Sequence, residues 1–457
     1  MSGRVVRIDS RETMGFAPEQ SYDAVKAREL SLSRLLVAYI VAGLAFMLLP
    51  GTFLGVWNLI SISNHRAADT ISAPWIQAHG HAQIFGWIGS FILGIGFHSL
   101  PMVRRRFAIR TGWICFALWA SGVLLRWVSN VYLWHWRIFL PISAAMELAA
   151  FLLFFRTVSQ HKTADGEKSN LEPWIWVVIV ATVGFLAALV MNTAAVLYVA
   201  FRGASPAFPA ELDQRFLVLC AWGFLVPFVW GFNAKWLPIF LGLRPTNNRL
   251  LGTALALNLI GVIAAQIGWL QWSAVLVFLG AIFSMIGLRI AQPNIRPAKT
   301  AGVHASFPWF VRSAYIWLLV AGALGIWASS THNSSGIWGA SRHALTVGFL
   351  AVMVFSIGQR VLPAFSGMKL LFSPRLMLCS LSLLSLGCFL RVASEVLAYQ
   401  DFAQWAWKVL PVSALLELSG VTVFAVNLGI SFSRRPAHLL SQSSPAVATN
   451  SSLRSVK

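Results

Sequence analysis

The chain has 457 residues, of which 57% are hydrophobic and only 11% are charged. A soluble domain would carry about a quarter charged residues, so the composition excludes an ordinary soluble protein and indicates a polytopic membrane protein. The formal net charge of +20 does not indicate nucleic-acid binding, because the basic residues gather in alternate loops, as membrane topology requires. The lipid bilayer is therefore the first predicted partner, and no nucleic acid is expected.

The two ends of the chain differ from its centre. Residues 1–33 mix arginines with acidic residues and lack the apolar segment of a signal peptide, which predicts a cytoplasmic N-terminal tail. Residues 34–432 are predicted to form the membrane domain, and residues 433–457, rich in Ser, Ala and Pro, a disordered cytoplasmic tail. Twelve membrane spans are expected within the membrane domain. They cover residues 34–56, 79–101, 108–129, 137–157, 173–200, 215–241, 249–269, 272–290, 309–329, 341–363, 374–397 and 405–432.

The loops that follow even-numbered spans hold most of the Lys and Arg residues. The loop after the second span alone holds Arg104, Arg105, Arg106 and Arg110. By the positive-inside rule, both termini are predicted to be cytoplasmic. The second span then runs inward from AHGHAQIFGW, so its histidines lie near the outer face.

Two stretches of the chain resemble each other in sequence. HAQIFGWIGSFILGIGFHSLP begins at His81, and HALTVGFLAVMVFSIGQRVLP begins at His343. Both place a glycine five residues after the histidine and end in Leu-Pro. The similarity continues into the next spans, where Arg126 aligns with Arg391. PISAAMELAA then aligns with PVSALLELSG, which pairs Glu147 with Glu417.

A weaker third copy, VLCAWGFLVPFVWGFNAKWLP, begins at Val218 and lacks the histidine. Its Lys235 stands where His98 and Arg360 stand in the outer copies. The chain is therefore predicted to consist of three units of four spans, an all-α membrane fold. We call these units 1, 2 and 3.

Three four-helix units with histidines on spans 2 and 10 resemble subunit I of the haem-copper oxidases. The resemblance implies that His81 and His343 bind one haem iron from opposite faces, as imidazoles commonly do. Arg126 and Arg391 are expected to pair with the haem propionates. The alternative for both arginines is snorkelling to the membrane surface.

Local motifs resemble a narrower family. HGHAQIFG is similar to the HxHEMxFG signature of the NnrS family, and RHALTVG, from Arg342 to Gly348, resembles its second signature. LWASGVLLRW in the third span is similar to another segment of that family. The resemblance implies a bacterial inner-membrane protein that binds haem b and acts in nitric-oxide response or electron transfer, with nitric oxide or another diatomic as ligand.

The resemblance also implies that copper is bound, but two features of the sequence argue against a copper site. Ala82-Gln83 replaces the Glu-Met of the signature, and His79 and His81 lie about 200° apart around a helix, so they would not face one ion. His79 stays a candidate metal ligand or a neighbour of one. The sequence leaves open whether the protein is an enzyme and which electron donor serves it.

Two other functions remain open. An oxygen or nitric-oxide reductase of the haem-copper class needs copper held by three imidazoles, whereas spans 5–8 contain no histidine. A cofactor-free transporter would give Glu147 and Glu417 proton or substrate roles. Transporters normally show two six-span halves rather than a four-span period. We expect each glutamate instead to be a protonated hydrogen-bonding group.

Overall fold

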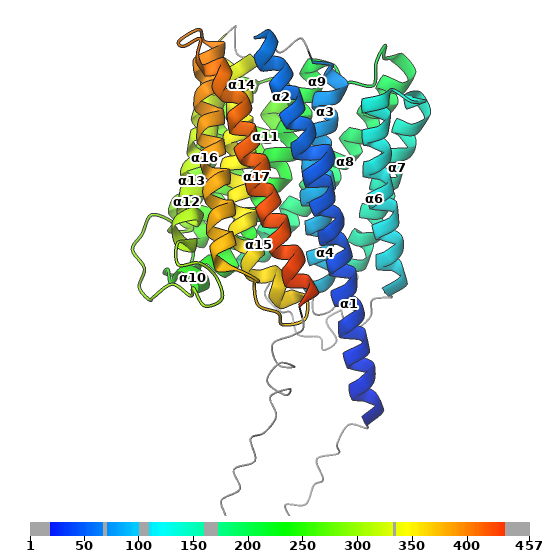
Figure 1. Cartoon of the computed structure of the whole chain (residues 1–457), viewed down its shortest axis with the longest axis vertical. Helices are drawn as coiled ribbons and strands as arrows, with labels where there is room; N and C mark the ends of the chain where they lie inside the picture. Colours follow the sequence, from blue (N-terminus) through cyan, green and yellow to red (C-terminus); the bar gives the residue numbers. More distant parts are fainter. Residues whose placement is uncertain (1–18, 67–70, 100–108, 160–171, 332–334, 435–457) are drawn as a thin grey trace, which may run out of the picture.

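The computed structural model of the protein describes residues 19–66, 71–99, 109–159, 172–331 and 335–434. Within these residues every regular element is a helix, and the helices form one upright bundle (Figure 1). We call the end at which the first helix begins the lower end and the opposite one the upper end (Figure 1). Residues 1–18 and 435–457 of the two predicted tails, and the arginines at 104–106, lie outside the described residues, whereas residues 19–33 of the predicted N-terminal tail are helical.

Twelve helical spans of the described residues are long and apolar enough to cross a membrane, which confirms the predicted fold class. Several spans consist of an α-helix, a π-helical segment and a second α-helix. In chain order the elements are α1 (Glu19–Phe46), η1 (Met47–Phe53), α2 (Leu54–His65), α3 (Ala73–His81), η3 (Ala82–Gly89), α4 (Ser90–Ser99), α6 (Ile109–Tyr132), α7 (Trp136–Ser159), α8 (Pro173–Arg202), α9 (Ala210–Val218), η4 (Leu219–Leu225), α10 (Val226–Leu241), α11 (Asn248–Gln266), α12 (Leu270–Gly287), α13 (Phe307–Ser330), α14 (Ser335–His343), η5 (Ala344–Ala351), α15 (Val352–Phe365), α16 (Pro374–Tyr399) and α17 (Ala406–Ser433).

The first span is longer than the predicted range 34–56. Its helix begins at Glu19 and continues through Pro50 to His65. A proline lacks the N–H that an α-helix needs and normally interrupts it. Here the interruption is absorbed by the wider turn of η1, so the chain continues as α2 instead of leaving the membrane.

The three repeat units share a structural feature that follows the sequence alignment. In each unit a π-helical segment begins directly after the aligned first position, which is His81, Val218 or His343. The segments are η3, η4 and η5. A π-turn widens the helix and is found mostly at functional sites. The predicted four-span repeat is therefore visible in the backbone itself.

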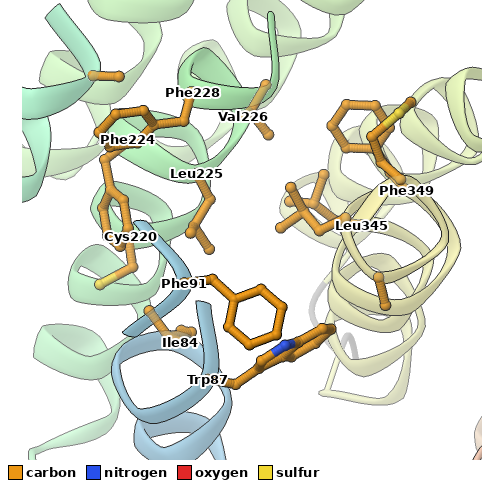
Figure 2. Close-up of a cluster of buried hydrophobic side chains, with 14 of the residues drawn as sticks. Ile84, Trp87, Phe91, Cys220, Phe224, Leu225, Val226, Phe228, Leu345 and Phe349 are labelled. Atoms are coloured by element: carbon orange, nitrogen blue, oxygen red, sulfur yellow. The ribbon is translucent and has the colours of Figure 1, made fainter. Parts of the chain in front are cut away.

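Apolar side chains from the second, sixth and tenth spans gather in one buried cluster (Figure 2). Trp87 and Phe91 come from the second span, Phe224 from the sixth and Phe349 from the tenth (Figure 2). Phe224 also stacks on Phe185 of α8, with ring centroids 4.5 Å apart. Packing of this kind, rather than the hydrophobic effect, holds helices together in lipid. The second, sixth and tenth spans therefore meet through apolar side chains.

Candidate functional site

His79 lies on α3 and reaches the first span. Its Nδ1 is 2.8 Å from the carbonyl oxygen of Gly51, in the π-helical segment η1. A Cβ at Gly55 would come within 2.6 Å of the imidazole ring, so only glycine leaves room for the ring there. The Pro50 irregularity and this glycine together seat the imidazole against the first span. His79 is also close enough to His343 and Arg391 to interact electrostatically with them.

His81 points to a different neighbour, as the predicted angle between the two histidines requires. Its Nε2 is 2.8 Å from Oε1 of Glu147 on α7, and the two side chains are 4% and 0% exposed. The ring stacks on Phe85, with centroids 4.7 Å apart. The other ring nitrogen, Nδ1, is buried without a hydrogen-bond partner. Thus His81 and Glu147 bond to each other inside unit 1 and are shielded from solvent, and we call them the closed pair.

Arg126 is buried beside this pair. Its side chain is 2% exposed, and its guanidinium lies 4.7 Å from the ring centroid of Phe208. Glu147 and Asp213 are its electrostatic neighbours. Nε and Nη1 are buried and have no hydrogen-bond acceptor among the described residues. Burial to this extent contradicts the snorkelling alternative, because a snorkelling guanidinium reaches water.

His343 ends α14 and is more open than His81. Its Nδ1 is 2.9 Å from the carbonyl oxygen of Gly339, one turn earlier, and 3.5 Å from Oε2 of Glu395. The His343 side chain is 27% exposed, against 4% for His81. A space beside the imidazole is therefore accessible in unit 3, whereas the matching position of unit 1 is filled.

Arg391 and Glu395 form an ion pair one helical turn apart on α16. Arg391 Nε lies 3.4 Å from Glu395 Oε2, and both side chains are buried. Arg391 Nη1 has no hydrogen-bond partner. Snorkelling is excluded here for the same reason as at Arg126. The sequence analysis missed Glu395, although its four-residue spacing from Arg391 on a helix was a usable signal.

The glutamates at the aligned positions of units 1 and 3 are packed alike but bonded differently. A Cβ at Gly122 would lie 2.9 Å from Cγ of Glu147, and one at Gly387 would lie 2.7 Å from Cγ of Glu417. Each glycine thus lets its glutamate lie flat against the neighbouring helix. Glu147 is bonded to a histidine, whereas Oε1 of Glu417 has no hydrogen-bond partner.

A further contact between units was also missed by the sequence analysis. Arg342, on α14, donates a hydrogen bond to Gln214 on α9. Asp213 and Glu395 are electrostatic neighbours of the same guanidinium. The predicted site residues therefore lie in one polar layer that spans all three units. Within the described residues, no group of three or more His, Cys, Asp or Glu side chains is arranged to hold a metal ion.

The remaining histidines lie elsewhere. His65 and His135 are at the upper end, outside this layer, and position 332 is outside the described residues. His98 is buried near the lower end, where its ring lies 5.2 Å from that of Phe365. His98 therefore does not share the site.

Comparison with known proteins confirms the fold. A chain of a heme-copper terminal oxidase dimer, solved by cryo-EM, matches with a TM-score of 0.67 and 12% sequence identity, covering 90% of this chain and 85% of that chain. At so low an identity the match shows the fold alone, a haem-copper-oxidase-like membrane fold. No curated protein matches the sequence. A family model described as a domain of unknown function, DUF8744, matches residues 180–427, more than half of the chain. The chain therefore belongs to the DUF8744 family.

Proposed function

We propose that the protein is a haem b-binding protein of the bacterial inner membrane that acts in nitric-oxide response or electron transfer. The observation that carries the proposal is a hydrogen bond shared by two imidazoles, one from span 2 and one from span 10, in which Nδ1 faces a backbone carbonyl. His79 Nδ1 faces the carbonyl of Gly51, and His343 Nδ1 faces the carbonyl of Gly339. A carbonyl only accepts hydrogen bonds, so Nδ1 carries the proton in both rings.

With Nδ1 bonded in this way, Nε2 is the nitrogen of each ring that can offer a lone pair to a metal. Histidines that bind metals use the same arrangement, in which a hydrogen bond from one ring nitrogen fixes the ring and the other nitrogen binds the metal. The partial exposure of His343 supports the presence of room beside Nε2. The two rings come from different units of the repeat, which supports two-sided ligation of one iron.

The geometry favours His79 over His81 as the ligand from span 2. Nε2 of His81 is occupied by Glu147, and its Nδ1 is enclosed by protein. Ligation by His81 would require breaking that buried pair. His79 needs no such change, and it already interacts electrostatically with His343. We therefore infer that His343 and His79 would hold the haem and that His81 has a supporting role.

Arg126 and Arg391 fit the haem carboxylates. Each guanidinium is buried with Nη1 lacking an acceptor, and a buried cation without a full set of acceptors is costly. Propionate oxygens would supply charge-assisted hydrogen bonds to these atoms. Haem b, when bound, supplies an iron that carries one electron and can bind a diatomic ligand.

The narrower assignment to nitric oxide rests on the NnrS-like motifs HGHAQIFG and RHALTVG.

We do not include copper, because spans 5–8 provide no histidine. Four-span periodicity in the backbone also separates this fold from the two six-span halves of a transporter. We also propose that both termini face the cytoplasm, because the basic residues gather in the loops on the same side of the membrane as the termini.

The test is a comparison of three glutamine variants by pyridine haemochrome after purification in detergent. His343→Gln and His79→Gln should lose most of the haem. His81→Gln is the matched control, because glutamine still offers an N–H to Glu147. The control should retain haem, and wild-type protein in the reduced state should show a shifted Soret band with nitric oxide.

Two results would change the assignment. Loss of haem in His81→Gln with full retention in His79→Gln would return the ligand role to His81. Full retention in all three variants, or the absence of haem from wild-type protein, would remove the haem proposal. Sustained consumption of nitric oxide by the purified protein would favour the reductase instead.

A further inference from the structure

A cavity of about 330 Å³ lies at the lower end of the bundle, away from His79, His81 and His343. His98 lies behind its wall, with its ring 5.2 Å from that of the lining residue Phe365. The cavity is lined by α10, α15 and the chain segments around residues 301–303 and 369–371. Among the described residues, its wall contains two cations, Arg360 and Lys369, and no carboxylate. A cavity of this size with convergent cations is suited to an anionic ligand.

Arg360 is held by aromatic rings and not by a counter-ion. Its guanidinium carbon lies 4.4 Å from the ring centroid of Phe240 and 5.5 Å from that of Phe307. Nη1 is buried and has no hydrogen-bond acceptor in the described part of the chain. In the same residues no carboxylate lies within ion-pair distance of Arg360. An arginine fixed in this way has donors available for an anion.

The aligned position of unit 2 provides a comparison within the same chain. Lys235 occupies it, and Nζ lies 2.6 Å from Oε2 and 3.0 Å from Oε1 of Glu172. Its ammonium also lies 5.5 Å from the ring of Trp174. Unit 2 thus provides both an aromatic ring and a carboxylate for its cation. Around Arg360 the described residues provide rings only, from α10 and α13, so this guanidinium has donors available for an anion.

The surroundings of the cavity are those of a membrane edge. Leu370 and Trp236, both in the cavity wall, are 64% and 39% exposed. Large apolar side chains at the surface of a membrane span face lipid, and tryptophan favours the headgroup level. Lys369 donates to the carbonyl of Phe432, which leaves other ammonium hydrogens available.

From these features we propose that the cavity binds the phosphate headgroup of an anionic phospholipid. The phosphodiester would lie between Arg360 and Lys369, and the acyl chains would run along Trp236 and Leu370. Basic pockets between membrane helices on the cytoplasmic side are the usual location of such lipids. The lower end is also the end predicted to be cytoplasmic. The proposal does not depend on haem binding.

Native mass spectrometry of the full-length protein in detergent tests the proposal. The protein is titrated with phosphatidylglycerol, or with phosphatidylcholine of the same acyl chains. Wild-type protein should retain one phosphatidylglycerol more tightly than phosphatidylcholine. Arg360→Gln should weaken this binding about tenfold, the equivalent of one charge-assisted hydrogen bond. Lys369→Gln should weaken it less, because this ammonium also bonds to the protein.

The control is Arg244→Gln, which removes the same charge from an exposed residue after α10 that does not line the cavity. It should bind lipid as wild type does. Equal binding by Arg360→Gln and Arg244→Gln would overturn the proposal. If Arg360→Gln does not stay monodisperse, unchanged binding by Lys369→Gln overturns it instead. Equal retention of phosphatidylcholine, or full displacement of the lipid by excess inorganic phosphate, would also contradict an anionic-lipid site.

Discussion

Units 1 and 3 inherited the same polar residues from one repeat and use them in different ways. In unit 1, His81 and Glu147 are bonded to each other and fully enclosed. In unit 3, His343 is partly exposed and Oε1 of Glu417 has no partner. The two units therefore carry equivalent polar side chains in different environments. In unit 1 they are enclosed by protein, and we call it the closed unit; in unit 3 the histidine is partly exposed, and we call it the open unit.

A single substitution explains much of this difference. Four residues after the shared arginine, unit 1 has Asn130 and unit 3 has Glu395. Asn130 is buried and donates to the carbonyl of Pro74. Glu395 instead contacts both Arg391 and His343. A carboxylate at this position can hold an imidazole and a guanidinium together, whereas an amide cannot balance the charge of the guanidinium.

The largest effect on stability is expected at the closed pair. Glu147→Ala leaves His81 buried without its partner, and loss of one member of a buried pair costs about 3 kcal/mol in free energy of unfolding. Glu417→Ala is the matched change in unit 3 and should cost clearly less. Denaturant unfolding of both variants in detergent measures the difference. Equal losses would contradict the division into a closed and an open unit.

A second prediction concerns what the two units share. A Cβ at Gly122 would lie 3.0 Å from the carbonyl oxygen of Ser143, and one at Gly387 would lie 3.0 Å from that of Ser413. Because the obstacle in both cases is backbone, each Gly→Ala change should cost about 2 kcal/mol through overpacking. Unfolding measurements on both variants check this. A cost in one unit only would show that the helix pairs α6–α7 and α16–α17 are not packed equivalently.

The fold was largely predictable, because a helix that crosses a bilayer needs a long run of apolar residues. Apolar runs long enough to cross the bilayer marked all twelve spans, and the glycine and Leu-Pro spacing marked the repeat. The continuation of the first helix past Pro50 was not predictable from local rules, since a proline usually predicts a break. Only the surrounding helices determine whether a π-turn absorbs it.

Most residues of the site were predictable from the sequence, but the contacts between their side chains were not. Sequence alignment of the units found Arg126, Arg391 and the histidines because duplication preserved their spacing. Which histidine faces which helix depends on the π-segments and on the carbonyl of Gly51, 28 residues away from His79. Side chains such as Asp213 reach the layer from another unit, and no local pattern encodes that approach.

The third prediction tests whether Glu395 distinguishes the open unit. Glu395→Asn places the residue of unit 1 into unit 3. If His343 binds haem as proposed, haem affinity should fall about tenfold, the lower end of the effect of removing a partner of a metal ligand. Haem titration of the apoprotein measures it. Glu211→Gln, at a 91% exposed carboxylate, is the control and should leave affinity unchanged.

The smallest effect is expected at the lower end, where units 2 and 3 differ. Hydrogen bonds from Lys235, and then from Trp174, hold the pKa of Glu172 below its ordinary value of 4.5. A carboxyl whose pKa is lower in the folded state stabilises the fold above its unfolded pKa, and this contribution disappears as pH falls through the folded pKa. Because Glu172 is exposed, solvent screens the pair and the contribution is small.

The measurement is the Tm of wild type and Glu172→Gln between about pH 6 and pH 3. Wild type should have the higher Tm at the upper pH, and the gap should close as the solution is acidified, because protonated Glu172 no longer pairs with Lys235. Arg360→Gln provides the contrast. Its position has no carboxylate partner in the described residues, so in lipid-free detergent its Tm gap from wild type should not close over the same range. A constant gap for Glu172→Gln, or a closing gap for Arg360→Gln, would contradict the distinction between an internal and an external counter-ion.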